Sequence, residues 1–178
     1  MLCPKCGAQL ADNAKYCYSC GDVISNPQDT YVADTTIREM FLKSSGRLNR
    51  LRYFKRSIIV GIFKVLMMLV LLVILKLSDV DLDDLDLFHI VIVVYIVFTV
   101  PFYFLYVRRL QDLNKNNTLA IIRTVSGLVL LFLTATQDET TVLSLIVSLI
   151  TLYIDLYLLF ADGTHGRNDY GADPLGRV

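Results

Sequence analysis

Four apolar stretches dominate the chain after residue 56. The first, residues 57–77, is almost unbroken hydrocarbon. As an α-helix it would be about 31 Å long, enough to cross a bilayer core of roughly 30 Å. Three more follow at residues 88–107, 119–135 and 142–160. Pro101 predicts a kink in the second, and the third is short for a span. The pattern predicts an all-α integral membrane protein with four transmembrane helices, whose membrane domain spans residues 57–162.

The charged residues around these stretches are segregated by sign. Nine of the 17 Lys and Arg residues precede residue 57. The two loops expected on the far side carry seven Asp and Glu residues, and their only base is Lys76, at the end of the first stretch. Because basic loops stay in the cytoplasm, we expect a multi-pass plasma-membrane protein with both termini in the cytoplasm. Residues 163–178 would form a Gly-rich cytoplasmic tail.

Two segments lead into the first apolar stretch. Residues 25–36 are polar and aperiodic, and we interpret them as a linker. Residues 37–56 combine an apolar stripe with many basic residues, which predicts an interfacial helix that Gly46 can divide. Its basic face would contact anionic lipid headgroups. The same helix could dock a partner, but we favour the lipid anchor.

All four cysteines of the chain lie in residues 1–24, as two C-x-x-C-G units. They are Cys3, Cys6, Cys17 and Cys20. Two such turns facing each other present four thiolates to a tetrahedral Zn²⁺, and so short a segment depends on the metal for its folding energy. A pair of disulfides is the alternative, but it needs an oxidising compartment. We predict a zinc ribbon whose Zn²⁺ is structural, since four protein ligands leave no open position for catalysis.

Three ionisable residues lie within the predicted spans, all in their cytoplasmic third: Lys64, Arg123 and Asp155. The long side chains of the two bases can snorkel to the headgroups, but the short Asp155 side chain cannot. We therefore predict that Asp155 faces the bundle and pairs with Arg123 or Lys64. The alternative is an ion or proton site inside the bundle; we favour the structural pair.

Three cytoplasmic segments carry a family resemblance: GRLNRLRYF from Gly46, VRRLQDLNKNN from Val107 and DGTHGRNDYGADP from Asp162. Their order and positions resemble the domain of unknown function 805 family, small bacterial inner-membrane proteins, over residues 41–174. The resemblance implies a four-helix membrane domain and no established activity. Members often carry His at the position of Gln111 and Gly and Trp near residues 116–118, where this chain has Asn, Asn and Thr. The cysteine segment resembles the small zinc ribbons fused to many bacterial membrane proteins.

The same cytoplasmic segments suggest a composite anion site. Its candidate residues are Arg47, Arg50, Arg108, Arg109, Asp112, Gly166, Asn168 and Gly171. The arginines would hold a lipid phosphate or an acidic partner, and N–H groups of the Gly-rich tail would line an anion-binding concavity. In the alternative, which we favour, the arginines follow the positive-inside rule, and Asp112 and Asp173 pair with them to hold the loops.

Enzyme signatures are weak in this sequence. His89 and His165 lie near no nucleophile pattern, and no phosphate-binding loop is present. We expect a non-enzymatic scaffold or regulator whose zinc ribbon binds a protein partner; nucleic acid is not favoured, because the basic patch lies against the membrane. The alternatives are a small transporter or lipid-handling protein using Asp155 and the cytoplasmic arginines, and an enzyme acting on lipid headgroups. Four short helices leave little room for a pathway, so transport would call for a homo-oligomer.

Overall fold

The computed structural model describes residues 2–3, 5–11, 14, 16–22, 31–77, 84–135 and 141–177, apart from the side chains of 84–88, 135 and 141. Its helices are α1 (Ile37–Phe41), α2 (Arg50–Leu77), α3 (Asp84–Asp112), α4 (Thr118–Ala135) and α5 (Thr141–Phe160). Isolated β-bridges join Leu2 to Gln9 and Asn168 to Gly171. The fold is all-α, as the sequence predicts. Residues 78–83 and 136–140, which make up most of the two acidic loops, lie outside the described residues, whereas Asp84 and Asp86 belong to α3.

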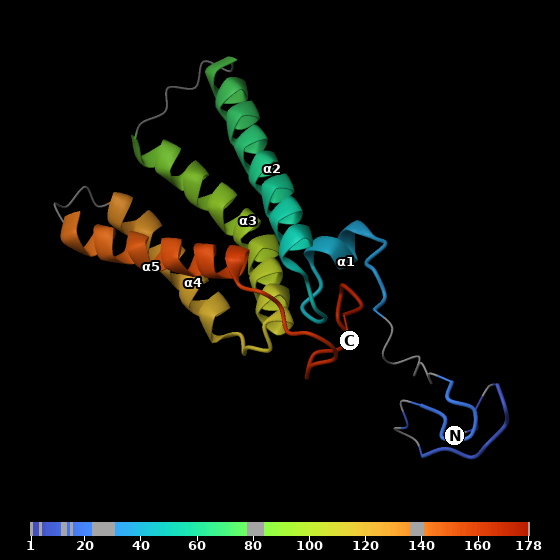
Figure 1. The fold of residues 1–178 in the computed structure, drawn as a ribbon. Helices are drawn as coiled ribbons and strands as arrows, with labels where there is room; N and C mark the ends of the chain where they lie inside the picture. Colours follow the sequence, from blue (N-terminus) through green and yellow to red (C-terminus); the bar gives the residue numbers. More distant parts are fainter. Residues whose placement is uncertain are drawn as a thin grey trace.

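The four long helices correspond to the four predicted apolar stretches. Among the described residues, α2, α3 and α5 are long and apolar enough to cross a membrane, and α4 is a shorter apolar helix. Figure 1 shows these helices fanning out from one end, where α1 and the C-terminal tail lie. Pro101 lies inside α3, which changes direction near its middle (Figure 1). The predicted kink has its physical cause in the proline ring.

The buried core is concentrated at the end where the helices converge. Leu48, Leu105, Leu110 and Leu158 are fully buried there. Towards the other end, apolar side chains point outward: Phe63 on α2 is 62% exposed and Leu145 on α5 is 59% exposed. Outward-facing apolar surface on long helices is what a lipid environment favours. The helices are therefore packed tightly against one another at the end where they converge, and they present apolar surface elsewhere.

The predicted interfacial helix over residues 37–56 is divided around Gly46, as the sequence allows, and its second part belongs to α2. Thr36 begins α1 with a capping box, in which its side chain accepts from the Glu39 N–H and the Glu39 side chain accepts from the Thr36 N–H. The helix ends at Phe41, and Gly46 adopts φ 94° in the loop that follows. Asn49 then caps α2 by accepting from the Arg52 N–H at 2.9 Å. The basic residues from Arg50 onward thus form the first turns of α2.

The predicted linker over residues 25–36 is too long. Residues 25–30 lie outside the described part, but residues 31–36 pack against the helices. The Arg52 guanidinium lies 4.8 Å from the centre of the Tyr31 ring, and the Asp34 side chain is only 1% exposed. The segment that precedes α1 is therefore part of the folded domain.

The turn between α3 and α4 follows from Asn114, which has φ 53°. Asn tolerates this left-handed conformation better than most residues. The Asn114 N–H donates to the Gln111 carbonyl and the Lys115 N–H to the Leu110 carbonyl, which closes the end of α3 as a Schellman motif. This termination places Arg108, Arg109 and Asp112 on the last turn of α3.

Candidate functional site

The four cysteines form two turns of nearly identical backbone geometry. The Gly7 N–H donates to the Cys3 carbonyl at 2.9 Å, and the Gly21 N–H donates to the Cys17 carbonyl at 2.8 Å. Gly7 and Gly21 have φ of 71° and 72°, a region that glycine reaches without steric cost. The two C-x-x-C-G units therefore fold into two equivalent knuckles, as the spacing predicts.

The sulfur atoms of these knuckles fit a four-coordinate metal ion. The Cys3 and Cys20 sulfurs lie 3.8 Å apart and the Cys6 and Cys17 sulfurs 3.5 Å apart, and all four lie within 4.8 Å of one another. Zn–S bonds of about 2.3 Å in a tetrahedron give S···S edges of about 3.8 Å. The cysteines are all free thiols, so the site suits metal binding, with zinc the ion that best matches four thiolates.

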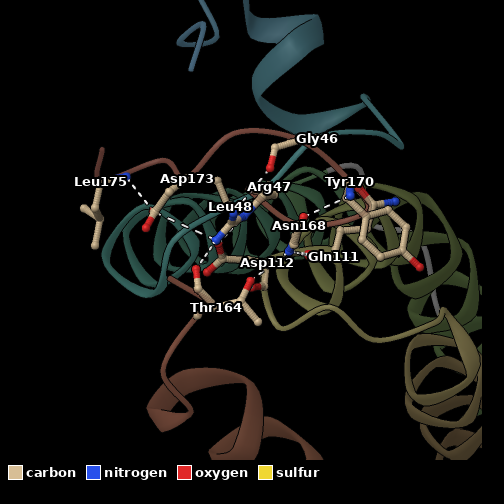
Figure 2. Close-up of polar contacts among 12 residues, drawn as sticks. Gly46, Arg47, Leu48, Gln111, Asp112, Thr164, Asn168, Tyr170, Asp173 and Leu175 are labelled. Atoms are coloured by element: carbon tan, nitrogen blue, oxygen red, sulfur yellow. Dashed lines mark hydrogen bonds and ion pairs between the residues drawn. The ribbon is translucent and has the colours of Figure 1, made fainter. Parts of the chain in front are cut away.

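Arg47 is the centre of a second polar cluster, in which the loop before α2, the end of α3 and the C-terminal tail meet (Figure 2). Its guanidinium donates to Asp112 Oδ1 at 3.1 Å and to the carbonyls of Thr164, Gly166 and Gly171. The Asp173 carboxylate lies 3.9 Å away. Arg47 is 1% exposed, so its charge is compensated almost entirely by protein groups.

Arg109 and Arg108 are compensated in the same way on the two sides of α3. The Arg109 guanidinium contacts Asp112 Oδ2 at 2.5 Å and donates to the carbonyls of Leu158 and Ala161 at the end of α5. The Arg108 guanidinium donates to both oxygens of Asp34, at 2.8 and 3.1 Å, and to the Glu39 carbonyl at 2.8 Å. Arg108 and Arg109 are 2% and 0% exposed.

The structure does not form the anion site considered from the sequence. The tail presents carbonyl oxygens to Arg47, whereas an anion needs N–H groups. The Gly166 N–H donates instead to the Arg177 carbonyl and the Gly171 N–H to the Asn168 carbonyl. The Asn168 side chain donates to the Gln111 carbonyl at 2.8 Å. Of the candidate arginines only Arg50 is exposed, and it pairs with Asp162 at 3.0 Å. The geometry agrees with the alternative in which acidic residues pair with the arginines to hold the loops.

Burial and ion pairing compete at Asp34 and Asp173, two acidic residues of these clusters that lie outside the helices. Burial alone would raise the pKa of the Asp34 carboxyl, but hydrogen bonds from Arg108 and Arg56 hold that pKa below its ordinary value. The pKa of Asp173 is also lowered, because the Leu175 N–H and the Arg177 guanidinium outweigh the effect of burial. Both side chains therefore favour the ionised form that the arginines require.

The intramembrane charges occupy a separate place, between α2, α3, α4 and α5. Asp155 accepts two hydrogen bonds from Arg123, at 2.7 and 2.8 Å, so it pairs with one of the two partners expected from the sequence. The Lys64 ammonium lies 4.7 Å from the centre of the Tyr95 ring. The three side chains line one cavity of about 490 Å³.

Some residues of these clusters are not among the sequence-based candidates. Asp34 is the main one: it pairs with Arg108 and with Arg56, at 2.7 Å to the latter. A signal existed, since buried arginines need acidic partners and Asp34 is one of only two acidic residues in residues 31–56. Gly163 is another, because a Cβ there would lie 2.8 Å from the Asp112 Cγ. No local pattern distinguishes this glycine from its neighbours.

The comparison with known families separates the cysteine segment from the helical part of the chain. The model described as "protein of unknown function (DUF805)" matches residues 41–172, and the model of a zinc-ribbon domain matches residues 2–24. The chain belongs to the DUF805 family. Its DUF805 domain contains α2 to α5, Arg47, Asp112 and most of the tail, whereas Asp34 precedes the matched region. No curated protein and no solved structure matches the chain.

Proposed function

We propose that this protein is a non-enzymatic scaffold or regulator, in which a membrane-embedded DUF805 domain carries a zinc ribbon that binds a protein partner. The observation that carries the proposal is the surface of the ribbon. Leu2, Tyr16 and Tyr18 are 69%, 64% and 80% exposed, although Cys3, Leu10 and Cys17 are buried beside them. Exposed aromatic residues on a small rigid module are typical of protein-binding surfaces.

The ribbon suits recognition better than chemistry or nucleic-acid binding. Four thiolates complete the coordination of a zinc ion, so the metal would hold the fold and offer no open position to a substrate. Residues 1–24 contain two basic and two acidic residues, which gives no electropositive surface for nucleic acid. A protein surface is the partner that fits this chemistry.

The arginine cluster supports a structural role for the inner end of the DUF805 domain. Arg47, Arg108 and Arg109 donate to carboxylates and carbonyls of the protein itself. Arginines whose N–H groups already donate within the protein are poorly placed to bind a substrate or to transfer protons. The alternative in which Asp155 and these arginines act together on a substrate loses support as well, since Asp155 pairs with Arg123 in a separate cluster.

The orientation belongs to the same proposal. Reduced thiols persist in the cytoplasm, and the arginine-rich ends of α2 and α3 lie beside α1 and the C-terminal tail. Both observations support a plasma-membrane protein whose termini face the cytoplasm. The zinc ribbon would then meet cytoplasmic proteins at the membrane surface.

The test is affinity capture of the full chain from native membranes after mild cross-linking. The variant Tyr16→Ala/Tyr18→Ala should lose a specific protein partner while it retains its zinc, and Cys17→Ser/Cys20→Ser should lose both. Tyr170→Ala is the matched control, because Tyr170 is an exposed tyrosine of the DUF805 domain. The proposed binding surface would be refuted if Tyr16→Ala/Tyr18→Ala captured the same proteins as the native chain and the Tyr170→Ala control.

A further inference from the structure

The cavity between the long helices combines apolar walls with a cluster of charged and hydroxyl side chains. Its volume is about 490 Å³. Its polar lining includes three charged residues, the tyrosines of α2 and α3, and the hydroxyls of Ser57, Thr99 and Thr124. Lys64 and Asp155 lie about 8–10 Å inside the ends of the predicted spans. The Thr99 and Thr124 hydroxyls donate to carbonyls of their own helices, so the cost of this site in hydrocarbon lies with its charges.

The charges of the cavity do not cancel. Arg123 and Asp155 form a bidentate pair, which leaves Lys64 as an additional positive charge. The Lys64 ammonium contacts the Tyr95 ring, and it forms no ion pair with a carboxylate in the described part of the chain. The site therefore has a net charge of about +1, which complements a singly charged anion.

An apolar groove on α2 adjoins this cavity. Ile58, Ile62 and Leu66 line the groove, and Gly61 and Val65 line both the groove and the cavity. Gly61 has no other atom within 4 Å of the place where a Cβ would stand, so the surface is open at the junction. The cavity holds the charged side chains, and the groove beside it is apolar. Together they suit a molecule with a charged headgroup and an apolar chain.

We propose that this cavity binds the phosphodiester group of an anionic phospholipid, with one acyl chain in the groove of α2. A phosphodiester carries a single negative charge, which Lys64 and the Arg123–Asp155 pair together compensate. A headgroup without a cation fits best, because Asp155 is already paired and offers no partner to an ammonium. In the orientation proposed above, the lipid would enter from the cytoplasmic leaflet.

Gly127 acts as a positioning residue for this site. A Cβ at Gly127 would overlap the Tyr95 hydroxyl, and it would lie 3.4 Å from Tyr95 Cζ and 3.2 Å from Arg123 Nη1. The missing side chain thus lets the Tyr95 ring lie between α3 and α4, beneath the Lys64 ammonium. Replacement by alanine should displace the ring and alter the lysine position.

The experiment is a lipid titration of the detergent-purified full chain, followed by native mass spectrometry. We expect phosphatidylglycerol to bind more tightly than phosphatidylcholine, and Lys64→Met to weaken phosphatidylglycerol binding by roughly tenfold or more, the usual effect of losing a charged hydrogen bond. Lys76→Met is the matched control, since Lys76 is an exposed lysine at the far end of the same helix. Equal affinities of Lys64→Met and Lys76→Met would overturn the proposal.

Two further measurements test the charge of the cavity and the role of the groove separately. Asp155→Asn raises the charge of the cavity to about +2, so it should bind anionic lipid more tightly even though it loses an ion pair. A weaker affinity of Asp155→Asn, in protein that remains folded, would show that the charges serve stability alone and would overturn the proposal. Inorganic phosphate at millimolar concentration should not displace the lipid; full displacement would assign the site to free phosphate and exclude the groove.

Discussion

At the scale of the residue, Gly163 sets how closely the C-terminal tail approaches α3. A Cβ at this position would lie 2.8 Å from Asp112 Cγ and 3.0 Å from Asp112 Oδ1. We expect Gly163→Ala to displace the carboxylate from Arg47 and Arg109 and to cost about 1–3 kcal/mol, as overpacking usually does. The melting temperature in detergent measures this effect. Gly61→Ala is the control, because space is free around Gly61, and an equal loss in both variants would contradict the expectation.

Arg47 provides a second prediction at this scale. Its planar guanidinium reaches Asp112 and three carbonyls at once, which a lysine ammonium cannot reproduce. Arg47→Lys should therefore cost about 1–3 kcal/mol, the usual penalty for leaving buried acceptors without their hydrogen bonds. Arg50→Lys, at an exposed pair with Asp162, should change stability by less than about 1 kcal/mol. Thermal unfolding of the two variants, measured side by side, would reveal no difference if Arg47 were merely a positive-inside charge.

The residue scale also shows what the sequence can and cannot predict. The metal site could be predicted, because each C-x-x-C-G unit is local and its geometry is contained in five residues. The pairing of Asp155 could be predicted from the cost of a lone carboxylate in the membrane. The partners of Arg47 could not, because they lie 65 to 124 residues further along the chain. Only the folded chain shows that the tail approaches with its carbonyl oxygens.

At the scale of the element, the segment that contains α1 braces α2 against α3. Asp34 pairs with Arg56 of α2 at 2.7 Å and with Arg108 of α3 at 2.8 Å. Arg56 also donates to the Met40 carbonyl, and Arg108 to the Glu39 carbonyl, at the end of α1. Two helices that are long and apolar enough to cross a membrane are thus joined at their ends through one short segment.

This brace should respond to acid. The pKa of Asp34 in the folded protein is lower than its ordinary value of 3.8. Its contribution to stability is therefore complete above about pH 4 and is lost as the pH falls through the lower folded value. Asp34→Asn should reduce the melting temperature at neutral pH and weaken the fall in stability between pH 5 and about pH 3. Asp162→Asn, an exposed control, should keep the native pH profile; an unchanged profile in Asp34→Asn would exclude the brace.

Element boundaries were predictable where hydropathy decides them. The ends of α4 and α5 agree with the predicted stretches to within about two residues, because apolar runs determine them. The beginning of α2 was not predictable from hydropathy, since Asn49 caps it within a basic segment. The packing of residues 31–36 was hidden for a similar reason: a polar sequence with one buried aspartate resembles a linker until its arginine partners are known.

At the scale of the whole molecule, the chain combines two units that are stabilised in different ways. The ribbon buries Cys3, Leu10 and Cys17, too little to fold without its metal. The helical unit, residues 31–177, contains the DUF805 domain and has its own core and its own buried ion pairs. Metal binding and helix packing should therefore be separable.

Removal of zinc tests this separation. A strong chelator should unfold the ribbon and expose four thiols per chain, because coordination supplies the folding energy of such modules. The melting temperature of the helices should stay within about 2 °C, since no residue of the arginine cluster depends on the metal. Thiol titration, zinc analysis and the helical signal in detergent measure the three quantities on one sample. Cys17→Ser/Cys20→Ser should reproduce the chelated state. Loss of helical stability on chelation would instead mean that the zinc ribbon and the DUF805 domain fold as one cooperative unit.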